Sequence, residues 1–580
     1  MEPVVGIDLG TTNSEVAYII NKNAEILKDN DNGILPSCVG LNNDDKIIVG
    51  HEARNQAIIA PERTVLSIKR LMGKDEKILL GGVGYLPQEI SAFILKALKE
   101  RAEKALNQKI SNAVITVPAY FTDAQRLATR EAGEIAGLNV VRIINEPTAA
   151  ALAYESTGAG KQTVLIFDLG GGTFDVSIVK IENGIVEVLA STGDNQLGGD
   201  DFDIKILNKL KDHIKNELKL DISNNTKVLA RLRRAAENAK IELSSKPYTI
   251  IEEDHIGKKT FKSIHLSYEF SRTDFEKLIE DDLLRTMDSV NNALHDANLS
   301  PSKIDKIILV GGSTRIPEIS KMLERKFNIL PHSEIDPDLC VAIGAAIQAG
   351  REMGKEDISS ILLDITPYTF GTSALGELHG VPTVSMFVPI IRRNTKLPAI
   401  KSEAFYTVYD KQEYVEIKIY QGEKPDALDN ILIGEYHFKL SKLPANSVII
   451  LKYSLDLNGI LKIEAVEKET GRKINATIEN AFAGFSEEEM AKSRKKIDSA
   501  WGAEDKISTE ENNNNISQDI PADINEVILE AQSKLNEASE EDREDMINLI
   551  EDIKDAISNN NIKDAEKAKS ELEEILLYIG

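Results

Sequence analysis

The sequence predicts a multidomain protein, in which an α/β region is followed by an antiparallel β domain and an acidic helical region. Its 580 residues exceed the roughly 250–300 residues at which a single hydrophobic core stops growing. The hydrophobic pattern changes near residue 356 and again near residue 481. We therefore place the domains at 1–355, 365–480 and 481–580, with a short linker at 356–364.

The first region alternates strand-like and helix-like segments. Short runs rich in β-branched residues end at turn signals, and helical patterns lie between them. The expected strands include Val4–Leu9, Ala113–Val117, Thr163–Phe167 and Lys306–Val310, and the expected helices include Pro87–Ala105 and Thr122–Ala136. Such alternation is typical of an α/β domain.

The linker and the segment after it lose the helical period. Ile361, Leu362 and Leu363 stand between acidic residues, in a segment that can dock through three apolar side chains. Residues 365–480 alternate with a period of two, and Asn458-Gly459 separates two alternating runs. Asn-Gly in that position is the strongest short signal for a hairpin. We therefore expect an antiparallel β domain.

The last region is acidic and helical. Ser486 followed by Glu489 is a helix-capping pattern. Residues 510–515, rich in Asn, predict a loop. Beyond this loop, apolar residues recur at helical spacing in three stretches that are too short for a coiled coil and predict a small bundle.

Composition and charge exclude several functions. The chain has 69 basic and 94 acidic residues and a net charge of −25, whereas nucleic-acid binding needs a basic face. Two cysteines, Cys38 and Cys340, in so long a chain are typical of a reducing compartment without disulfides. The sequence shows no signal peptide and no long apolar run, so we expect a cytoplasmic protein without a membrane span.

Two glycine turns repeat one pattern. Asp8-Leu9-Gly10-Thr11-Thr12 follows one predicted strand, and Asp168-Leu169-Gly170-Gly171-Gly172-Thr173 follows another. Glycine lets backbone N–H groups approach phosphate oxygens, a hydroxyl beside it can donate to the same oxygens, and the aspartate can hold Mg²⁺. One such turn is usually only a turn, but the pair predicts a nucleotide clamped from two sides.

A third glycine turn, Gly311-Gly312-Ser313-Thr314-Arg315, also follows a predicted strand. We expect it to approach the sugar and base, with the plane of Arg315 stacked on the purine. The alternative is an ordinary turn with Arg315 on the surface. The eight histidines show no metal-ligand spacing.

The chain that carries these motifs closely resembles the DnaK family of seventy-kilodalton heat-shock chaperones over residues 1–480. The resemblance rests on GIDLGTTNS at 6–14, IKRLMG at 68–73, TVPAYFTDAQR at 116–126, INEPTAAALAYE at 144–155, FDLGGGTFDVSIV at 167–179, LGGDDFD at 197–203, ILVGGSTRIP at 308–317 and DPDLCVAIGAA at 336–346. It implies an actin-like two-lobed α/β nucleotide-binding domain, then an antiparallel β-sandwich that binds peptides, then an α-helical bundle that forms a lid.

The resemblance implies an ATPase whose nucleotide state sets its affinity for exposed apolar segments of unfolded polypeptides. Its cofactors would be ATP or ADP and Mg²⁺, with K⁺ as a further candidate ion. Its partners would be extended polypeptides, a J-domain co-chaperone and a nucleotide exchange factor, with no nucleic acid and no membrane. A slow-cycling regulator of one dedicated protein partner is an alternative, as is a specialised short-lid paralogue similar to HscC. An actin-fold small-molecule kinase conflicts with the β domain.

The resemblance also assigns the nucleotide site residue by residue. Asp8 and Asp168 would hold Mg²⁺ through water, and Lys69 would place an ammonium near the γ-phosphate. Glu146 and Thr173 would position the attacking water and the phosphate. The other nucleotide contacts would be Gly10, Thr11, Thr12, Gly170, Gly171, Gly172, Glu237, Lys240, Ser244, Gly311, Gly312, Arg315 and Asp338.

Further roles concern coupling and peptide binding. Pro118 and Arg126 would relay between the cleft and the surface, Arg142 would contact J-domain proteins, and Leu362 and Leu363 would dock the linker. The peptide positions would be Phe405, Val415 and Ile417 in a pocket and Leu375 and Val408 in an arch. For Phe405 and Ile417 an ordinary core position is the alternative.

The chain departs from the family pattern at one place in the linker and at two places in the β domain. Ser360 stands where the linker usually has an apolar residue, and Thr372 replaces a usually apolar pocket residue. The stretch Gly376–Pro389 is longer than usual. Ser360 is expected to weaken docking of the linker, and the two departures in the β domain leave the choice of peptide open.

Overall fold

The computed structural model describes residues 2–156, 160–259, 262–332, 335–354, 361–477, 485–502 and 562–579, with isolated residues between 527 and 553. The chain forms two compact units, Met1–Trp501 and Gly502–Gly580, and each is described by itself. In the described residues, no helix is both long enough and apolar enough to cross a membrane.

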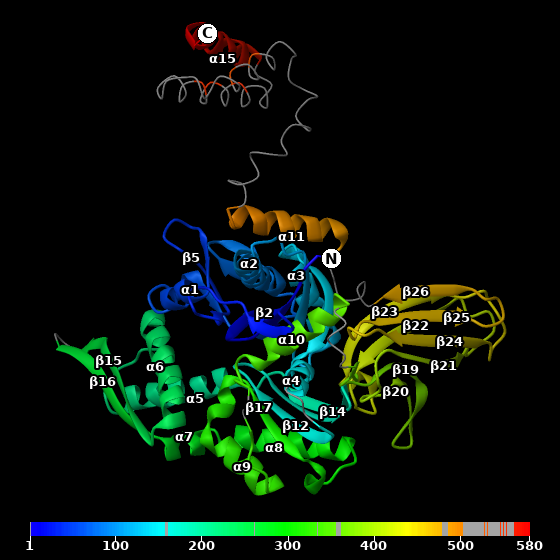
Figure 1. Cartoon of the computed structure of the whole chain (residues 1–580). Helices are drawn as coiled ribbons and strands as arrows, with labels where there is room; N and C mark the ends of the chain where they lie inside the picture. Colours follow the sequence, from blue (N-terminus) through cyan, green and yellow to red (C-terminus); the bar gives the residue numbers. More distant parts are fainter. Residues whose placement is uncertain are drawn as a thin grey trace. The chain divides into compact units, whose positions relative to one another are not determined.

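Two mixed sheets organise residues 2–354 (Figure 1). The first has the order β11-β10-β1-β2-β3, and the second has the order β17-β12-β13-β14-β18. In each sheet the strand before a glycine turn pairs in parallel with one neighbour and in antiparallel with the strand after the turn. The two glycine turns of the sequence therefore occupy equivalent places in two equivalent sheets.

The four strands named from the sequence are present in these sheets, with bounds that agree within two residues. The bounds of the main strands are β1 (Val4–Leu9), β2 (Asn13–Ile20), β3 (Asn23–Ile26), β10 (Asn112–Val117), β11 (Asn139–Asn145), β12 (Gln162–Leu169), β13 (Phe174–Glu182), β14 (Ile185–Asp194), β17 (Lys306–Val310) and β18 (Ile361–Leu363). Short strands beside them are β4 (Leu35–Pro36), β5 (Cys38–Leu41), β6 (Ile47–Val49), β7 (Thr64–Leu66), β8 (Ile78–Leu80) and β9 (Val83–Tyr85). The long strands β15 (Tyr248–Lys259) and β16 (Lys262–Ser271) form a two-stranded sheet of their own.

Helices cover the two sheets and fill the space between them. Their bounds are α1 (His51–Gln56), α2 (Pro87–Leu106), α3 (Asp123–Ile135), α4 (Glu146–Glu155), α5 (Gly199–Asn216), α6 (Thr226–Ser245), α7 (Arg272–Leu278), α8 (Glu280–Asp296), α9 (Pro317–Phe327) and α10 (Cys340–Glu352). Thr122, expected as the first residue of the helix, is the residue that caps α3. A Cβ on Gly344 of α10 would lie 1.8 Å from the Ala149 carbonyl oxygen of α4, so only glycine allows these helices to pack so closely.

The linker joins the second sheet as a strand. Ile361, Leu362 and Leu363 form β18, which pairs in parallel with β14 from Ile185 to Glu187. Leu362 packs against the core shared by the two sheets, whereas Ile361 is half exposed. The linker therefore docks through its main chain as well as through its apolar side chains. Residues 356–360, including Ser360, lie outside the described residues.

Residues 365–477 form two four-stranded antiparallel sheets, β20-β19-β22-β23 and β21-β24-β25-β26. One buried core joins them, with Ile391 and Ile419 from the first sheet and Tyr453 and Leu461 from the second. The bounds are β19 (Phe370–Leu378), β20 (Val381–Ile391), β21 (Ala399–Tyr406), β22 (Tyr414–Gln421), β23 (Ile431–Lys439), β24 (Val448–Leu455), β25 (Leu461–Glu467) and β26 (Lys473–Thr477).

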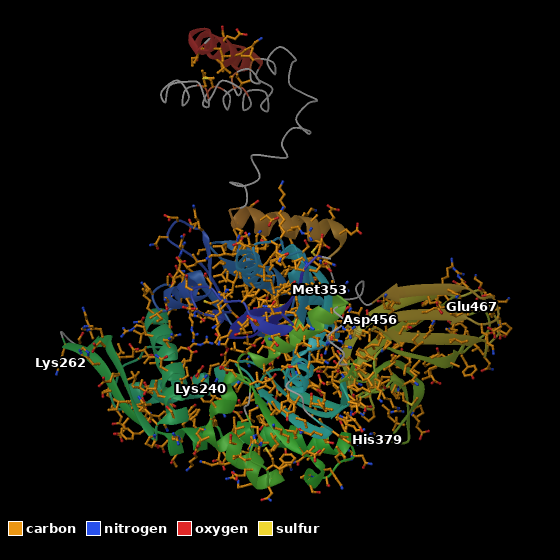
Figure 2. All side chains as sticks on the ribbon, in the orientation of Figure 1. Lys240, Lys262, Met353, His379, Asp456 and Glu467 are labelled. Atoms are coloured by element: carbon orange, nitrogen blue, oxygen red, sulfur yellow. The ribbon has the colours of Figure 1, made fainter. Side chains whose placement is uncertain are left out.

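Two hairpins of these sheets bear on the sequence predictions. Asn458-Gly459 lies in the turn between β24 and β25, as predicted. Figure 2 labels Asp456, the first residue after β24, and Glu467, the last residue of β25. The stretch Gly376–Pro389 forms most of the β19–β20 hairpin, which turns at His379 and Gly380 with φ of 52° and 83°.

Helix α11 (Glu487–Ala500) begins at the predicted cap, Ser486. Its Ile497 is fully buried against the core of the first sheet. Trp501, which follows the helix, stacks on Phe93 of α2 at 6.0 Å between ring centroids and donates its indole N–H to Glu100 Oε1 at 2.6 Å. This helix therefore belongs structurally to the first unit.

The second unit is described mainly through α15 (Ile562–Ile579), which contains the last predicted apolar stretch and buries Leu572 and Leu576. Ala531, Met546 and Ile553 are helical and fully buried, and they fall in the other two predicted helices. The predicted loop at 510–515 lies outside the described residues.

Candidate functional site

A cavity of about 330 Å³ lies where the three glycine turns meet. This volume is in the range of small-ligand pockets. Of the predicted nucleotide residues, those that line it are Asp8, Gly10, Thr11, Thr12, Lys69, Glu146, Asp168, Gly170, Gly171, Thr173, Glu237, Lys240, Ser244, Gly311, Gly312, Arg315 and Asp338. Gly172 lies just behind the wall, because a Cβ there would meet Thr11 and Arg70 within 3.0 Å.

The glycine turns approach one another closely. A Cβ on Gly171 would lie 1.9 Å from the Thr12 hydroxyl oxygen, so this contact between the two turns requires glycine. The Gly170 carbonyl accepts hydrogen bonds from the amide of Gly199 at 3.0 Å and the hydroxyl of Ser313 at 2.9 Å. The second and third turns are therefore held together by a direct hydrogen bond.

Buried carboxylates surround one ammonium at the centre of the cavity. Lys69 is 3% exposed and forms an ion pair with Glu146. Its Nζ lies 5.6 Å from the Phe121 ring centroid. Asp8 accepts a hydrogen bond from Thr116 at 2.7 Å, and Asp168 is 6% exposed. Burial raises the pKa of Asp8 to about 7 and raises the pKa of Asp168 well above its usual value.

This group of donors suits a divalent cation. Asp8, Asp168 and Glu146 carry more negative charge than Lys69 balances, and each pKa is raised mainly because burial disfavours the charged form. Asn13 Oδ1 and Glu15 Oε1 also face the cavity region without a hydrogen-bond partner. Oxygen donors in this arrangement are the ligands that Mg²⁺ takes, directly or through water.

The opposite wall comes from α6 and the third turn. Glu237, Lys240 and Ser244 line the cavity from one face of α6, as their helical spacing requires. Lys240 Nζ lies 2.8 Å from Asp203 Oδ1, yet burial still raises the pKa of Asp203 to about 6. Ile241 also lines the cavity and is 57% exposed. This wall combines fixed charge with an open apolar face.

Two ion pairs border the cavity at its edge. Arg54 of α1 pairs with Glu237 of α6, so the pair joins the part of the molecule that carries the first sheet to the part that carries the second. Arg315 donates to Asp336 Oδ1 at 2.9 Å and to Asp338 Oδ2 at 2.8 Å. The paired aspartates fix the guanidinium of Arg315 at the mouth of the cavity.

Several cavity residues were not predicted. They are Asn13, Glu15, Ile241, Val310, Ile316, Pro337 and Val341, and Asp203 lies behind Lys240. Ser313, which also lines the cavity, belongs to the third glycine turn that was expected there. Asn13 and Glu15 could have been found, because they continue the first glycine turn into β2. Asp203 had a weaker signal, since it ends the LGGDDFD motif, and only the structure pairs it with Lys240.

The predicted coupling residues lie along the contact with the two four-stranded sheets. Buried Arg126 donates to Asn145 Oδ1 at 2.6 Å and to the Ala119 carbonyl at 2.9 Å. Asn145 in turn donates to Asp364 Oδ2 at 3.0 Å. Asn145 precedes Glu146, so this chain of bonds leads from the end of the linker to the cavity. Pro118 is buried just after β10.

Arg142 lies apart from that chain. It is half-buried on β11, where it pairs with Val114, and its Nε is buried without a hydrogen-bond partner. Leu362 and Leu363 are half-buried in β18. The structure therefore separates the predicted coupling residues into a buried chain, a linker strand and Arg142.

The predicted peptide residues lie in different surroundings. Ile417 is 6% exposed in the core, and Phe405 and Val415 pack against that core while remaining partly exposed. Leu375 and Val408 are 60% and 61% exposed. Thr372 is buried, and its hydroxyl donates a hydrogen bond to the Lys418 carbonyl at 2.6 Å. This bond satisfies the polar group that stands where the family usually has an apolar side chain.

A further group of possible metal ligands lies on the outer face of β22 and β23. Among the described residues, Glu416, Glu435 and His437 are close enough together to share an ion, and all three are exposed. Lys418 Nζ lies 3.1 Å from Glu416 Oε2 and 4.0 Å from Glu435 Oε2. One ion pair within β22 and one between β22 and β23 therefore account for this group.

Comparison with known proteins gives a consistent result. The family model described as Hsp70 protein matches residues 4–80 and 75–580. The chain is 42% identical over 593 aligned positions to the "Chaperone protein DnaK" of Thermotoga neapolitana, which covers 100% of this chain and 97% of that protein. The protein of the same name from Thermotoga maritima matches with the same identity and coverage.

Proposed function

The chain belongs to the Hsp70 family, and on this premise we propose how its ATP-dependent chaperone activity is built. It is an ATP-hydrolysing chaperone of the DnaK type. In our proposal residues 1–355 are an actin-like two-lobed ATPase domain and residues 356–364 are the linker. Residues 365–480 are a β-sandwich that binds peptides, and residues 481–580 are a helical lid.

One observation carries the proposal. The cavity lined by the three glycine turns is connected, through hydrogen bonds of Arg126, Asn145 and Asp364, to the segment that leads into the two four-stranded sheets. A change at Glu146 can therefore reach Asp364 through one neighbouring residue, and a change at the sheets can reach the cavity by the same route. Such a connection is what control of peptide affinity by nucleotide requires.

In the nucleotide cavity each group has a distinct task. Thr11, Thr12 and the backbone of the glycine turns would bind phosphate oxygens. Asp8 and Asp168 would hold Mg²⁺ through water, and the ion would neutralise charge on the phosphates. Lys69 would stabilise the charge that develops as water attacks, and Glu146 and Thr173 would orient that water.

On the second wall, Glu237, Lys240 and Ser244 would contact the ribose and base, with Arg315 against the purine. Because the side chain of Ile241 is open to this space, it can contribute an apolar surface beside the base. A K⁺ ion is a further candidate occupant.

The free, buried Cys38 and Cys340 support a role in a reducing compartment such as the cytoplasm.

The proposed partners are extended polypeptides, a J-domain co-chaperone at Arg142 and a nucleotide exchange factor. Leu375 and Val408 would touch the bound polypeptide, since both are exposed apolar side chains. Apolar pockets beside strand edges accept extended segments through main-chain hydrogen bonds.

The test is ATP turnover of the full chain with and without a panel of unfolded peptides. The proposal predicts that at least some peptides accelerate turnover and that ATP accelerates their release. A slow-cycling regulator of one dedicated partner predicts basal turnover that no peptide in the panel changes. Replacing Ile361, Leu362 and Leu363 by serine should leave basal turnover and peptide binding largely intact while separating the two.

A further inference from the structure

Tyr368 connects the two four-stranded sheets to the nucleotide region by a second route. It lies between β18 and β19 and is 8% exposed. Its hydroxyl donates to the Tyr120 carbonyl oxygen at 2.6 Å, and the two rings are 4.5 Å apart between centroids, tilted by 39°. Tyr120 stands in the turn between β10 and α3. The contact therefore joins residues 248 positions apart.

The amide of the same residue, which belongs to the preceding Ala119–Tyr120 peptide group, reaches a buried carboxylate. The Tyr120 amide donates to Asp175 Oδ1 at 3.0 Å, and the Tyr120 carbonyl also accepts from Asn195 Nδ2 at 2.6 Å. Asp175 is 1% exposed on β13, and its register partner on β12 is Asp168. Directly opposed residues of an antiparallel pair carry their side chains on one face. Asp175 therefore lies beside the carboxylate that lines the cavity.

This route differs from the one through Arg126 in its two ends, although both touch the Ala119–Tyr120 peptide group, whose carbonyl accepts from Arg126 at 2.9 Å. The Arg126 route ends at Asn145, next to Glu146 on α4, whereas the Tyr368 route ends at Asp175, next to Asp168 on β12. The two routes thus reach different walls of the cavity. Each uses a different residue from the segment that leads into the sheets, Asp364 in one case and Tyr368 in the other.

We propose that Tyr368 is a positioning residue for ATP hydrolysis: its hydroxyl fixes the main chain at Tyr120, and through the Tyr120 amide it positions Asp175, while the sheets are docked. This inference rests on the proposed function, in which docking of the sheets controls the ATPase. When the sheets move away, the Tyr120 carbonyl keeps only Asn195 as a donor. The Tyr120 amide is then less constrained, and the carboxylate beside Asp168 is freer to move.

The variant Tyr368→Phe removes this hydroxyl and keeps the ring. One neutral buried hydrogen bond corresponds to about a two- to tenfold change in the equilibrium it favours. We therefore expect the ratio of peptide-stimulated to basal turnover to fall about two- to tenfold, with the change in kcat and little change in KM for ATP.

Tyr453→Phe is the matched control. Tyr453 is fully buried, and its hydroxyl donates to the Gly371 carbonyl at 3.1 Å within the two sheets. This variant loses the same kind of bond to a backbone carbonyl without touching the nucleotide region. The stimulation ratio should stay at the wild-type value even if thermal stability falls as much as in Tyr368→Phe.

Two results would overturn the inference: an unchanged ratio in Tyr368→Phe, or an equal loss in both variants, which would indicate general weakening of the sheets. If no peptide accelerates the wild-type protein, the proposed function itself fails. Basal kcat then decides the inference, because Asp175 acts without peptide as well. Equal basal kcat in the wild type and Tyr368→Phe would overturn it.

Discussion

The nucleotide cavity and the two four-stranded sheets use their predicted residues in opposite ways. In the cavity, residues from many separate segments converge on one buried space and carry fixed charges. In the sheets, the five predicted peptide residues range from the buried Ile417 to the exposed Val408. Phosphate chemistry needs charges held at fixed positions in a place of low polarity. Binding varied polypeptides needs apolar surface and strand edges. Such a site does not require its side chains to be held at fixed positions.

The largest expected effect lies in the cavity. Lys69→Ala should lower turnover about 10²- to 10³-fold, or roughly 3–4 kcal/mol, because the buried ammonium beside Glu146 is lost where negative charge develops. ATP should still bind, which separates the chemical step from affinity. Single-turnover hydrolysis measures the effect, and Lys104→Ala, whose side chain is 76% exposed, is the control. Near-normal hydrolysis by Lys69→Ala would remove this residue from the mechanism.

In the two four-stranded sheets, substitutions of buried residues should lower the stability of the protein, and substitutions of exposed residues should weaken peptide binding. Ile417→Ala should lower the free energy of unfolding by about 2–4 kcal/mol, because it leaves a cavity in the shared core. Leu375→Ala and Val408→Ala should change it by less than about 0.5 kcal/mol and should instead speed the release of bound peptide. Urea unfolding and peptide dissociation rates test the two halves. Unaltered release in both exposed variants would remove these residues from the peptide site.

The pH dependence of stability should report a buried carboxyl beside the cavity. Burial raises the folded-state pKa of Asp203 to about 6, above the value of about 4 in an unfolded chain. The unfolded state therefore loses its proton first, and the free energy of unfolding falls by about 2–3 kcal/mol as the pH rises from about 4 to 6.

Asp203→Asn should remove that contribution. Thermal unfolding of the wild type and the variant is measured at pH 4.5 and pH 6.5, two values that span most of this pH range. The contribution of Asp203 is the difference between the two proteins in their change of stability with pH. Asp221→Asn alters an exposed carboxyl and should keep the wild-type dependence. An identical pH dependence in the Asp203→Asn protein would show that Asp203 does not titrate in this range.

The smallest effect concerns the edge of the cavity. Arg54→Ala removes the partner of Glu237, and the two side chains are 23% and 21% exposed. An ion pair of this kind is worth about 1 kcal/mol, so nucleotide should dissociate roughly three- to fivefold faster. Stopped-flow release of a labelled nucleotide measures the rate. Arg130→Ala, which breaks an ion pair within α3, should leave the rate unchanged.

Much of the fold and of the cavity could be predicted because the information is local in the sequence. Val4–Leu9 and Lys306–Val310 are strands with the bounds expected from their apolar runs, and Ser486 caps its helix as predicted. The glycine turns combine all their functional groups within a few consecutive residues. A pattern of that kind is visible before any tertiary structure is known.

The remaining features depend on segments that are far apart in the sequence. The pairing of the linker with β14 is a main-chain contact between distant strands, and no property of Leu362 identifies its partner. The bond from Tyr368 to Tyr120 depends on how the sheets are placed. The surroundings of Leu375 and Ile417 likewise follow from the packing of two sheets, and alternation alone could not distinguish a pocket from a core.

The contact between α11 and α2 also has a spectroscopic consequence. Trp501 is the single tryptophan in the sequence, and it stacks on Phe93 with its indole N–H bound to Glu100. Indole emission shifts to longer wavelength when the ring passes from a packed to a hydrated environment. The tryptophan fluorescence of the whole protein therefore comes from one interface, and release of this helix can be followed optically without any label.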